Sequence, residues 1–194
     1  MARKPRVQFG GAFYHLTTRG NNRRPIFLDD RDREQFLGLF DTVLKSLAWR
    51  CHTFCLMGNH YHFVVETPEP NLAEGMFRLN GQYARIFNGR HGRGGHLFER
   101  RYSSVLIERE SHLLEACRYV VLNPVRAGLC ESADDWRWSS FRATAGLAGV
   151  PSFLVVDWLH QQFGCDTVTA RDQYIAFVNQ GSPAASLEGL LLAA

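Results

Sequence analysis

The spacing of hydrophobic residues divides the first 130 positions into seven regular elements. Residues 11–19 alternate apolar and polar positions, which predicts a strand with one buried face. Residues 29–48 begin with acidic residues and carry Lys45 near their end, which is typical of a helix. Its apolar stripe contains Phe36, Phe40, Val43, Leu44 and Leu47. Residues 49–57 and 60–66 are predicted strands that Gly58 and Asn59 join as a hairpin.

A second helix is predicted to begin at Asn71, where Glu74 three residues later makes a capping-box pattern. Its inward stripe contains Leu72, Met76, Leu79, Tyr83, Ile86 and Phe87. Residues 101–107 form a fourth strand, and the helix that carries Tyr119 follows. Strand, helix, strand, strand, helix, strand is the order of an α+β protein with a ferredoxin-like sheet and helices on one face. The other face would be left for a substrate and for the helix of Tyr119.

The segment Gly-Asn-His-Tyr-His-Phe-Val-Val at positions 58–65 holds the first candidate chemistry. In a strand, His60 and His62 point to the same face and Tyr61 to the other, so the two imidazoles can share a metal ion. The same pattern also fits two ordinary half-buried histidines, and a lone His-x-His motif favours that interpretation.

A short amphipathic helix before Pro124 holds the second candidate. Its buried stripe contains Leu113, Ala116, Cys117, Val120 and Val121. Tyr119 is left on the polar side beside Glu115 and Arg118, where the core does not explain an aromatic residue. Asn123 follows one turn later, so its amide oxygen could reach an ion held by the two histidines. The alternative role for Asn123 is to end the helix and cap a backbone group.

The composition describes one well-buried domain with an appendage, in a chain of 194 residues of which 45% are hydrophobic. We expect a cytoplasmic protein of bacterial type, because the sequence shows neither a membrane-length apolar run nor a signal-peptide core. The odd number of cysteines, five, favours reduced thiols over a disulfide scaffold. Cys51 and Cys55 could complete a zinc site with the two histidines, but buried small hydrophobes are the favoured interpretation.

Charge is distributed unevenly along the chain. Residues 1–130 carry 19 Lys and Arg against 12 Asp and Glu, whereas residues 131–194 carry 3 against 7. We therefore predict two parts, a basic domain over 1–130 that binds polyanions and a mostly helical extension over 131–194 with a packing or partner role. In the extension, 155–163 and 169–178 are predicted helices and 184–194 a frayed tail. The arginine excess could also reflect a GC-rich genome.

Six motifs occur in series: TTRGNNRRPIF, GNHYHFVVETP, LNGQYARIFN, GHLFERRY, RYVVLNPVRAGL and WRWSSF. Together they resemble the REP-associated tyrosine transposases, which are single-tyrosine HUH transposases with an IS200-like domain. The resemblance covers about two thirds of the chain and implies the antiparallel pairing of the strands. It also implies that Tyr119 is the nucleophile and that His60, His62 and Asn123 hold Mg²⁺ or Mn²⁺.

The activity implied by the resemblance is cleavage and rejoining of hairpin-containing single-stranded DNA through a 5′-phosphotyrosine. Because the ordinary phenol pKa is near 10, a metal would be needed to polarise the scissile phosphate. The predicted DNA-binding residues lie near loops and element ends: Arg19, Asn21, Asn22, Arg23, Arg24, Arg85, Arg100, Arg101 and Arg126. The protein would act as a monomer or homodimer, away from membranes. Two alternatives remain open, a rolling-circle initiator or relaxase and a hairpin-binding protein without turnover.

Overall fold

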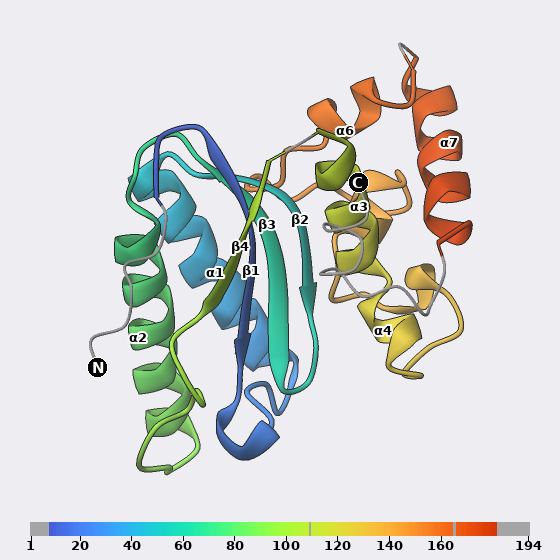
Figure 1. The fold of residues 1–194 in the computed structure, drawn as a ribbon. Coiled ribbons are helices and arrows are strands. Elements are labelled where there is room, and N and C mark those ends of the chain that lie inside the picture. The colour runs from blue at the N-terminus through green and yellow to red at the C-terminus, as the bar shows by residue number, and fades with distance from the viewer. Residues whose placement is uncertain (1–7, 109, 165, 182–194) are drawn as a thin grey trace.

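A four-stranded antiparallel sheet lies between two layers of helices in the computed structural model, which describes residues 8–108, 110–164 and 166–181 (Figure 1). The strands are β1 (Ala12–Arg19), β2 (Arg50–Leu56), β3 (His60–Thr67) and β4 (Ser103–Ile107). They are arranged in the order β2-β3-β1-β4, and every neighbouring pair is antiparallel. This order and the two helices between the strands confirm the predicted α+β, ferredoxin-like class.

Helices α1 (Asp30–Leu47) and α2 (Leu72–Arg90) cover one face of the sheet (Figure 1). Alternate strand residues such as Leu16, Tyr61 and Phe63 point toward these helices and are fully buried there. At the start of α1, the Asp29 carboxylate accepts a hydrogen bond from the Asp32 backbone N–H at 3.0 Å. The predicted bounds of this helix, 29–48, coincide with its two capping residues.

The start of α2 differs from the prediction. Asn71 is the N-cap residue, but its side chain makes no capping hydrogen bond. Its Oδ1 instead accepts a hydrogen bond from the Trp49 indole Nε1 at 2.5 Å. The capping box predicted with Glu74 is therefore wrong, because a buried indole N–H needs an acceptor and takes the asparagine oxygen.

The predicted hairpin between β2 and β3 is confirmed. The Met57 backbone N–H donates to the His60 carbonyl at 2.9 Å, which closes a tight turn over Gly58 and Asn59. The turn places His60 at the first position of β3. The two histidines therefore stand on a central strand of the sheet, next to β1.

Helix α3 (Glu110–Val121) packs on the second face of the sheet, as predicted for the helix of Tyr119 (Figure 1). All five residues of its predicted stripe are buried. A four-residue helix, α4 (Asn123–Arg126), follows it directly.

The segment after residue 130 is attached to the domain by backbone pairing as well as by side chains. The Leu56 N–H donates to the Trp138 carbonyl at 2.8 Å, and the Ser140 N–H donates to the Phe54 carbonyl at 2.9 Å. These bonds occupy the outer edge of β2, a position where a sheet would otherwise expose unpaired backbone groups. The segment also contains the short helix α5 (Phe141–Thr144).

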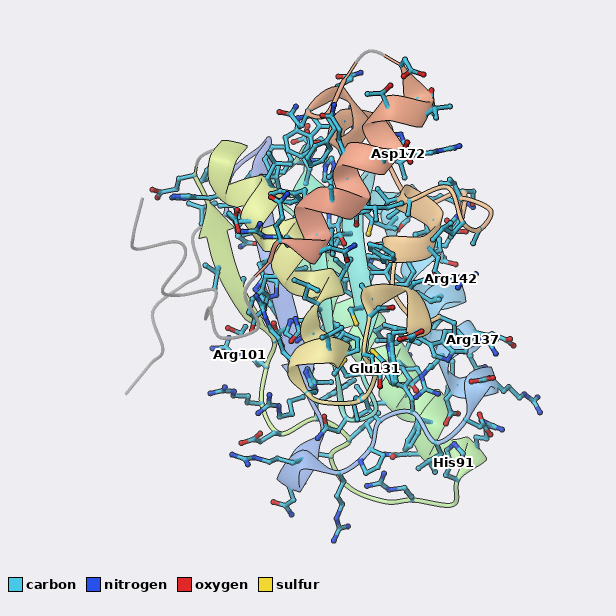
Figure 2. All side chains as sticks on the ribbon, turned by 90° about the vertical axis from the view of Figure 1, so that its right-hand side faces the viewer. His91, Arg101, Glu131, Arg137, Arg142 and Asp172 are labelled. Carbon is cyan, nitrogen blue, oxygen red and sulfur yellow. The ribbon has the colours of Figure 1, made fainter. Side chains whose placement is uncertain are left out.

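The last two helices are α6 (Asp157–Gln161) and α7 (Thr167–Asn179), close to the two predicted ones. Tyr174 and Val178 of α7 are buried in the same cluster as Val120 and Val121 of α3. In Figure 2 these two helices lie in front of the sheet, with Asp172 of α7 at the upper end of the molecule. The tail predicted over 184–194 lies outside the described residues. No helix in the described part of the chain has the length and apolar character to cross a membrane.

Candidate active site between the histidine strand and the tyrosine helix

His60 and His62 lie on the face of the sheet that α3 covers, as strand alternation predicts. Their ring centroids are 5.0 Å apart, with the rings nearly perpendicular. The antiparallel register pairs His62 with Thr17 of β1 and His60 with Arg19. Since residues paired in a ladder point to the same face, His15 and Thr17 join the histidine pair.

The hydrogen bonds of the two imidazoles leave one nitrogen of each ring available. Nδ1 of His62 lies 2.9 Å from Nε2 of His15 and 3.3 Å from the Thr17 hydroxyl. Nε2 of His62 is buried and has no hydrogen-bond partner among the described residues. Nδ1 of His60 donates to the Asn59 side-chain oxygen at 2.6 Å, so its Nε2 is the free one.

Burial keeps these imidazoles uncharged. Desolvation lowers the pKa of His15 to about 4, and desolvation together with the charge of Arg19 lowers the pKa of His60 to about 4. Desolvation lowers the pKa of His62 well below its usual value, and His15, His60, Arg19 and Arg126 add to the effect. Near neutral pH all three rings are therefore neutral, the state in which a ring nitrogen can bind a metal.

The Tyr119 ring packs against the histidines edge-on. Its centroid lies 5.9 Å from that of His15 and 6.0 Å from that of His62. The Arg126 guanidinium lies over the same ring, 4.5 Å from its centroid. This cation places a positive charge beside the phenol, where a phosphate would also approach.

Asn123 holds the end of α3 in place. Its Nδ2 donates to the Tyr119 carbonyl at 2.8 Å and approaches the Val120 carbonyl at 3.5 Å. In a continuous helix the backbone N–H groups of residues 123 and 124 would bind these two carbonyls, but Pro124 has no N–H. The Asn123 side-chain amide supplies a donor to these carbonyls, as the capping alternative predicts, and its Oδ1 is the atom that could act as a ligand.

The donor set fits a divalent metal in part. No group of three or more His, Cys, Asp or Glu within the described residues could hold a metal ion, so His60 and His62 would need other donors. A buried His62 nitrogen without a partner is the atom that a metal would satisfy. Amide, water and phosphate oxygens are the donors that Mg²⁺ and Mn²⁺ prefer.

Eight of the nine predicted DNA-binding residues fall into two groups. Arg19 ends β1, and the exposed loop of Asn21, Asn22, Arg23 and Arg24 follows it. The Asn59 side chain donates to the Arg23 carbonyl at 2.8 Å and so ties this loop to the turn beside His60.

The second group lies away from the histidines. Arg85, Arg100 and Arg101 line a groove between α2 and residues 95–102. Figure 2 shows Arg101 near the edge of the sheet that carries β4, far from Asp172. Arg126 belongs to neither group, because it lies on Tyr119.

His15 and Thr17 are the site residues that the sequence did not single out. Both occupy the same phase of the alternating segment 11–19 as Phe13 and Arg19. The alternation therefore shows that these residues share one face of the strand. It identifies that face as the functional one only once β1 is known to pair with β3.

The fold and the comparisons with known proteins define a transposase. The family described as "Transposase IS200 like" matches residues 9–123, so the chain belongs to the IS200-like transposase family. A Haemophilus influenzae protein with the name "Putative REP-associated tyrosine transposase" is 25% identical over 142 residues, which are 68% of this chain and 80% of the relative.

A solved structure of a REP-associated tyrosine transposase bound to a REP hairpin has the same fold. Its TM-score is 0.65 at 18% identity, and the match covers 86% of this chain and 93% of that one. The resemblance drawn from the six sequence motifs is thereby confirmed.

Proposed function

We propose that this transposase cleaves and rejoins hairpin-containing single-stranded DNA, with Tyr119 as the nucleophile. The observation that supports this most directly is the contact of the Tyr119 ring with both His15 and His62. In this contact a phenol lies beside two neutral imidazoles on a rigid sheet, with Arg126 over its ring. A tyrosine that served only the core would not need these polar neighbours.

A divalent ion, Mg²⁺ or Mn²⁺, would be held by Nε2 of His60, Nε2 of His62 and Oδ1 of Asn123. When bound, it would polarise the scissile phosphate and orient it for attack. The protein's own part is to keep both imidazoles neutral and correctly turned, through Asn59 for His60 and through His15 and Thr17 for His62. Asn123 holds the Tyr119 carbonyl with its amide nitrogen and leaves its oxygen for the ion.

In the proposed reaction the Tyr119 oxygen forms a bond to phosphorus while the bond from phosphorus to the 3′ oxygen breaks. The products are a 5′-phosphotyrosine and a free 3′-hydroxyl, which takes up a proton as the phenol loses one. The phosphodiester bond is exchanged without hydrolysis, so a 3′-hydroxyl can reverse the step. Cleavage and rejoining are then one reaction in two directions.

Tyr119 and the histidines of one chain already lie in contact, which supports attack by the tyrosine within its own chain. The DNA would approach over Arg19 and the loop of Asn21, Asn22, Arg23 and Arg24, because Arg19 pairs with His60 in the sheet and the loop is tied to the turn beside His60. The related structure contains a REP hairpin, and we infer that a hairpin-forming repeat is the substrate here as well.

The test is formation of a covalent adduct with a hairpin oligonucleotide in Mn²⁺, detected as a shifted band on a denaturing gel. Tyr119→Phe should abolish the adduct and leave hairpin binding nearly unchanged, because it removes only the nucleophilic oxygen. Tyr14→Phe, which removes a phenol oxygen on the face of the sheet that α1 and α2 cover, is the matched control and should retain the adduct. An undiminished adduct with Tyr119→Phe would refute the assignment. Hairpin binding without any adduct in the unmodified protein would instead support a DNA-binding protein without turnover.

A further inference from the structure

Arg126 contacts Tyr119 at two points. Its guanidinium carbon lies 4.5 Å from the centroid of the Tyr119 ring, and its Nη1 donates to the Tyr119 backbone carbonyl at 3.4 Å. One side chain therefore touches both the ring that would carry the nucleophile and the backbone from which this ring projects. The sequence predicts that Arg126 binds DNA, so its contact with a residue of the protein indicates a different role.

The segment Asn-Pro-Val-Arg-Ala-Gly at positions 123–128 folds so that Arg126 reaches back to Tyr119. Pro124 lies in the first turn of α4, where a proline is tolerated. Gly128 has a φ of 66°, and the Leu129 N–H donates to the Pro124 carbonyl at 2.9 Å, as in a Schellman motif that ends a helix. Arg126 follows Tyr119 by seven residues, about two helical turns, and long side chains on a helix point toward its N-terminus. The short helix is therefore fixed at both ends and directs Arg126 at Tyr119.

Arg126 also differs in burial from arginines that lie open to a polyanion. Arg23 and Arg24 are exposed, whereas Arg126 is half-buried. A guanidinium loses hydration when it is buried, and stacking on an aromatic face together with donation to a carbonyl offsets this loss. The burial of Arg126 therefore favours a role within the protein.

The same two-point contact occurs between Arg118 of α3 and Phe177 of α7. The Arg118 guanidinium carbon lies 4.4 Å from the Phe177 ring centroid, and its Nη1 donates to the Phe177 carbonyl at 3.3 Å. This contact joins two helices and involves neither Tyr119 nor a histidine. It is therefore a matched reference for the contact of Arg126, with the same chemistry in a place where only packing depends on it.

The Tyr119 ring needs a contact that holds its direction. Tyr119 is half-buried, and a side chain that is not enclosed by the core can occupy more than one staggered rotamer. In the rotamer present here the ring meets His15 and His62 edge-on. Because a displacement of about 1 Å can lower a reaction rate about 100-fold, a residue that fixes this rotamer contributes to the rate without touching the substrate.

We propose that Arg126 is a positioning residue, which holds the Tyr119 ring against His15 and His62 and acts through Tyr119 rather than through the DNA. The proposal rests on the proposed function in that Tyr119 is the nucleophile. The contact itself joins two side chains of the protein, so it can be measured without DNA.

The first test is the single-turnover rate of adduct formation in Mn²⁺ at saturating hairpin. Arg126→Gln should lower this rate about 100-fold, and a higher hairpin concentration should not restore it. Arg126→Lys keeps the charge but loses the planar group and its forked donors, so it should recover only part of the rate. Arg118→Gln removes the matched contact and should lower the unfolding temperature without lowering the rate. A loss that more hairpin relieves, or full recovery with Arg126→Lys, would make Arg126 a phosphate contact and overturn the proposal.

The second test needs neither DNA nor metal. In NMR spectra of protein with ¹³C-labelled tyrosine rings, Tyr119→Phe identifies the Tyr119 signal by its loss. Arg126→Gln should shift that signal, whereas Arg118→Gln should leave it in place. An unshifted Tyr119 signal in Arg126→Gln would overturn the proposal. If the signal shifts but the unmodified protein forms no adduct, the proposed function fails while the contact between Arg126 and Tyr119 stands.

Discussion

Nε2 of His15 on β1 lies 2.9 Å from Nδ1 of His62 on β3, although the two residues are 47 positions apart in sequence. The two rings are stacked, with centroids 5.2 Å apart and 8° between their planes. When Nδ1 of His62 donates to His15, the lone pair of His62 is on Nε2, the buried nitrogen that faces no partner among the described residues. If His62 holds the proposed ion, His15 would position a metal ligand without being one.

His15→Phe should weaken Mn²⁺ binding about 10- to 100-fold, the range for loss of a residue that orients a ligand. The phenyl ring fills the same space but accepts no hydrogen bond. His15→Gln offers an amide oxygen to Nδ1 of His62 and should recover part of the affinity. Isothermal titration with Mn²⁺ measures both. His52→Phe, another buried histidine on this sheet, is the matched control, and an equal loss there would show that packing alone is responsible.

The free energy of unfolding should fall as the pH drops from about 6.5 toward 4. His15 has a pKa of about 4 in the folded protein against an ordinary 6.5, so between these values the unfolded chain binds more protons. Excess protons on the unfolded chain favour unfolding. At about 1.4 kcal/mol per pKa unit, His15 alone would lower the free energy of unfolding by about 3 kcal/mol at pH 4. His60 shifts in the same direction and adds to the loss.

Urea unfolding followed by circular dichroism at several pH values measures this dependence. His15→Gln should flatten the slope between pH 4 and 6.5, because it removes one of the titrating groups. His96→Gln changes an exposed histidine and should leave the slope as it is. A His15→Gln slope equal to that of the unmodified protein would show that His15 does not take up a proton in this window.

Substitution can test the roles of the two polar side-chain atoms of Asn123, Nδ2 and Oδ1, separately. Asn123→Asp keeps an oxygen but loses the donor to the Tyr119 carbonyl, so it should retain Mn²⁺ affinity and lower the free energy of unfolding by about 1–3 kcal/mol. Asn123→Ala loses both atoms and should reduce both quantities. A stability loss in Asn123→Ala with an unchanged Mn²⁺ titration would leave Asn123 as a helix cap only.

DNA affinity should reside in the basic part of the chain. Arg23→Ala with Arg24→Ala should flatten the salt dependence of hairpin binding by up to about 1.4, at about 0.7 per phosphate contact with a single strand. Arg137→Ala with Arg142→Ala removes the same charge from the acidic segment, where both arginines already form ion pairs with aspartates. That control should keep its slope, and an equal change would place DNA contacts in the extension as well. Substitution is preferable to truncation, because residues 141–178 help to bury α3.

Local sequence patterns determined the secondary structure and the part of the candidate site that lies on β3. The caps of α1, the Gly58 turn and the placement of His60 and His62 on one face depend on residues within a few positions of one another. Such interactions act on the chain wherever the segment lies, so the sequence specifies them directly. The motif series also determined the family, since each motif keeps its order and spacing.

Tertiary structure decided which segments meet. His15 reaches His62 only through the register of β1 against β3, and a shift of one residue would turn it to the other face. Asn71 left its expected capping role because folding brought a buried indole N–H within reach. Residues 138–140 bind the outer edge of β2 because that edge is open in the folded sheet. Each of these contacts depends on distances between segments far apart in sequence, which local hydrophobic spacing does not encode.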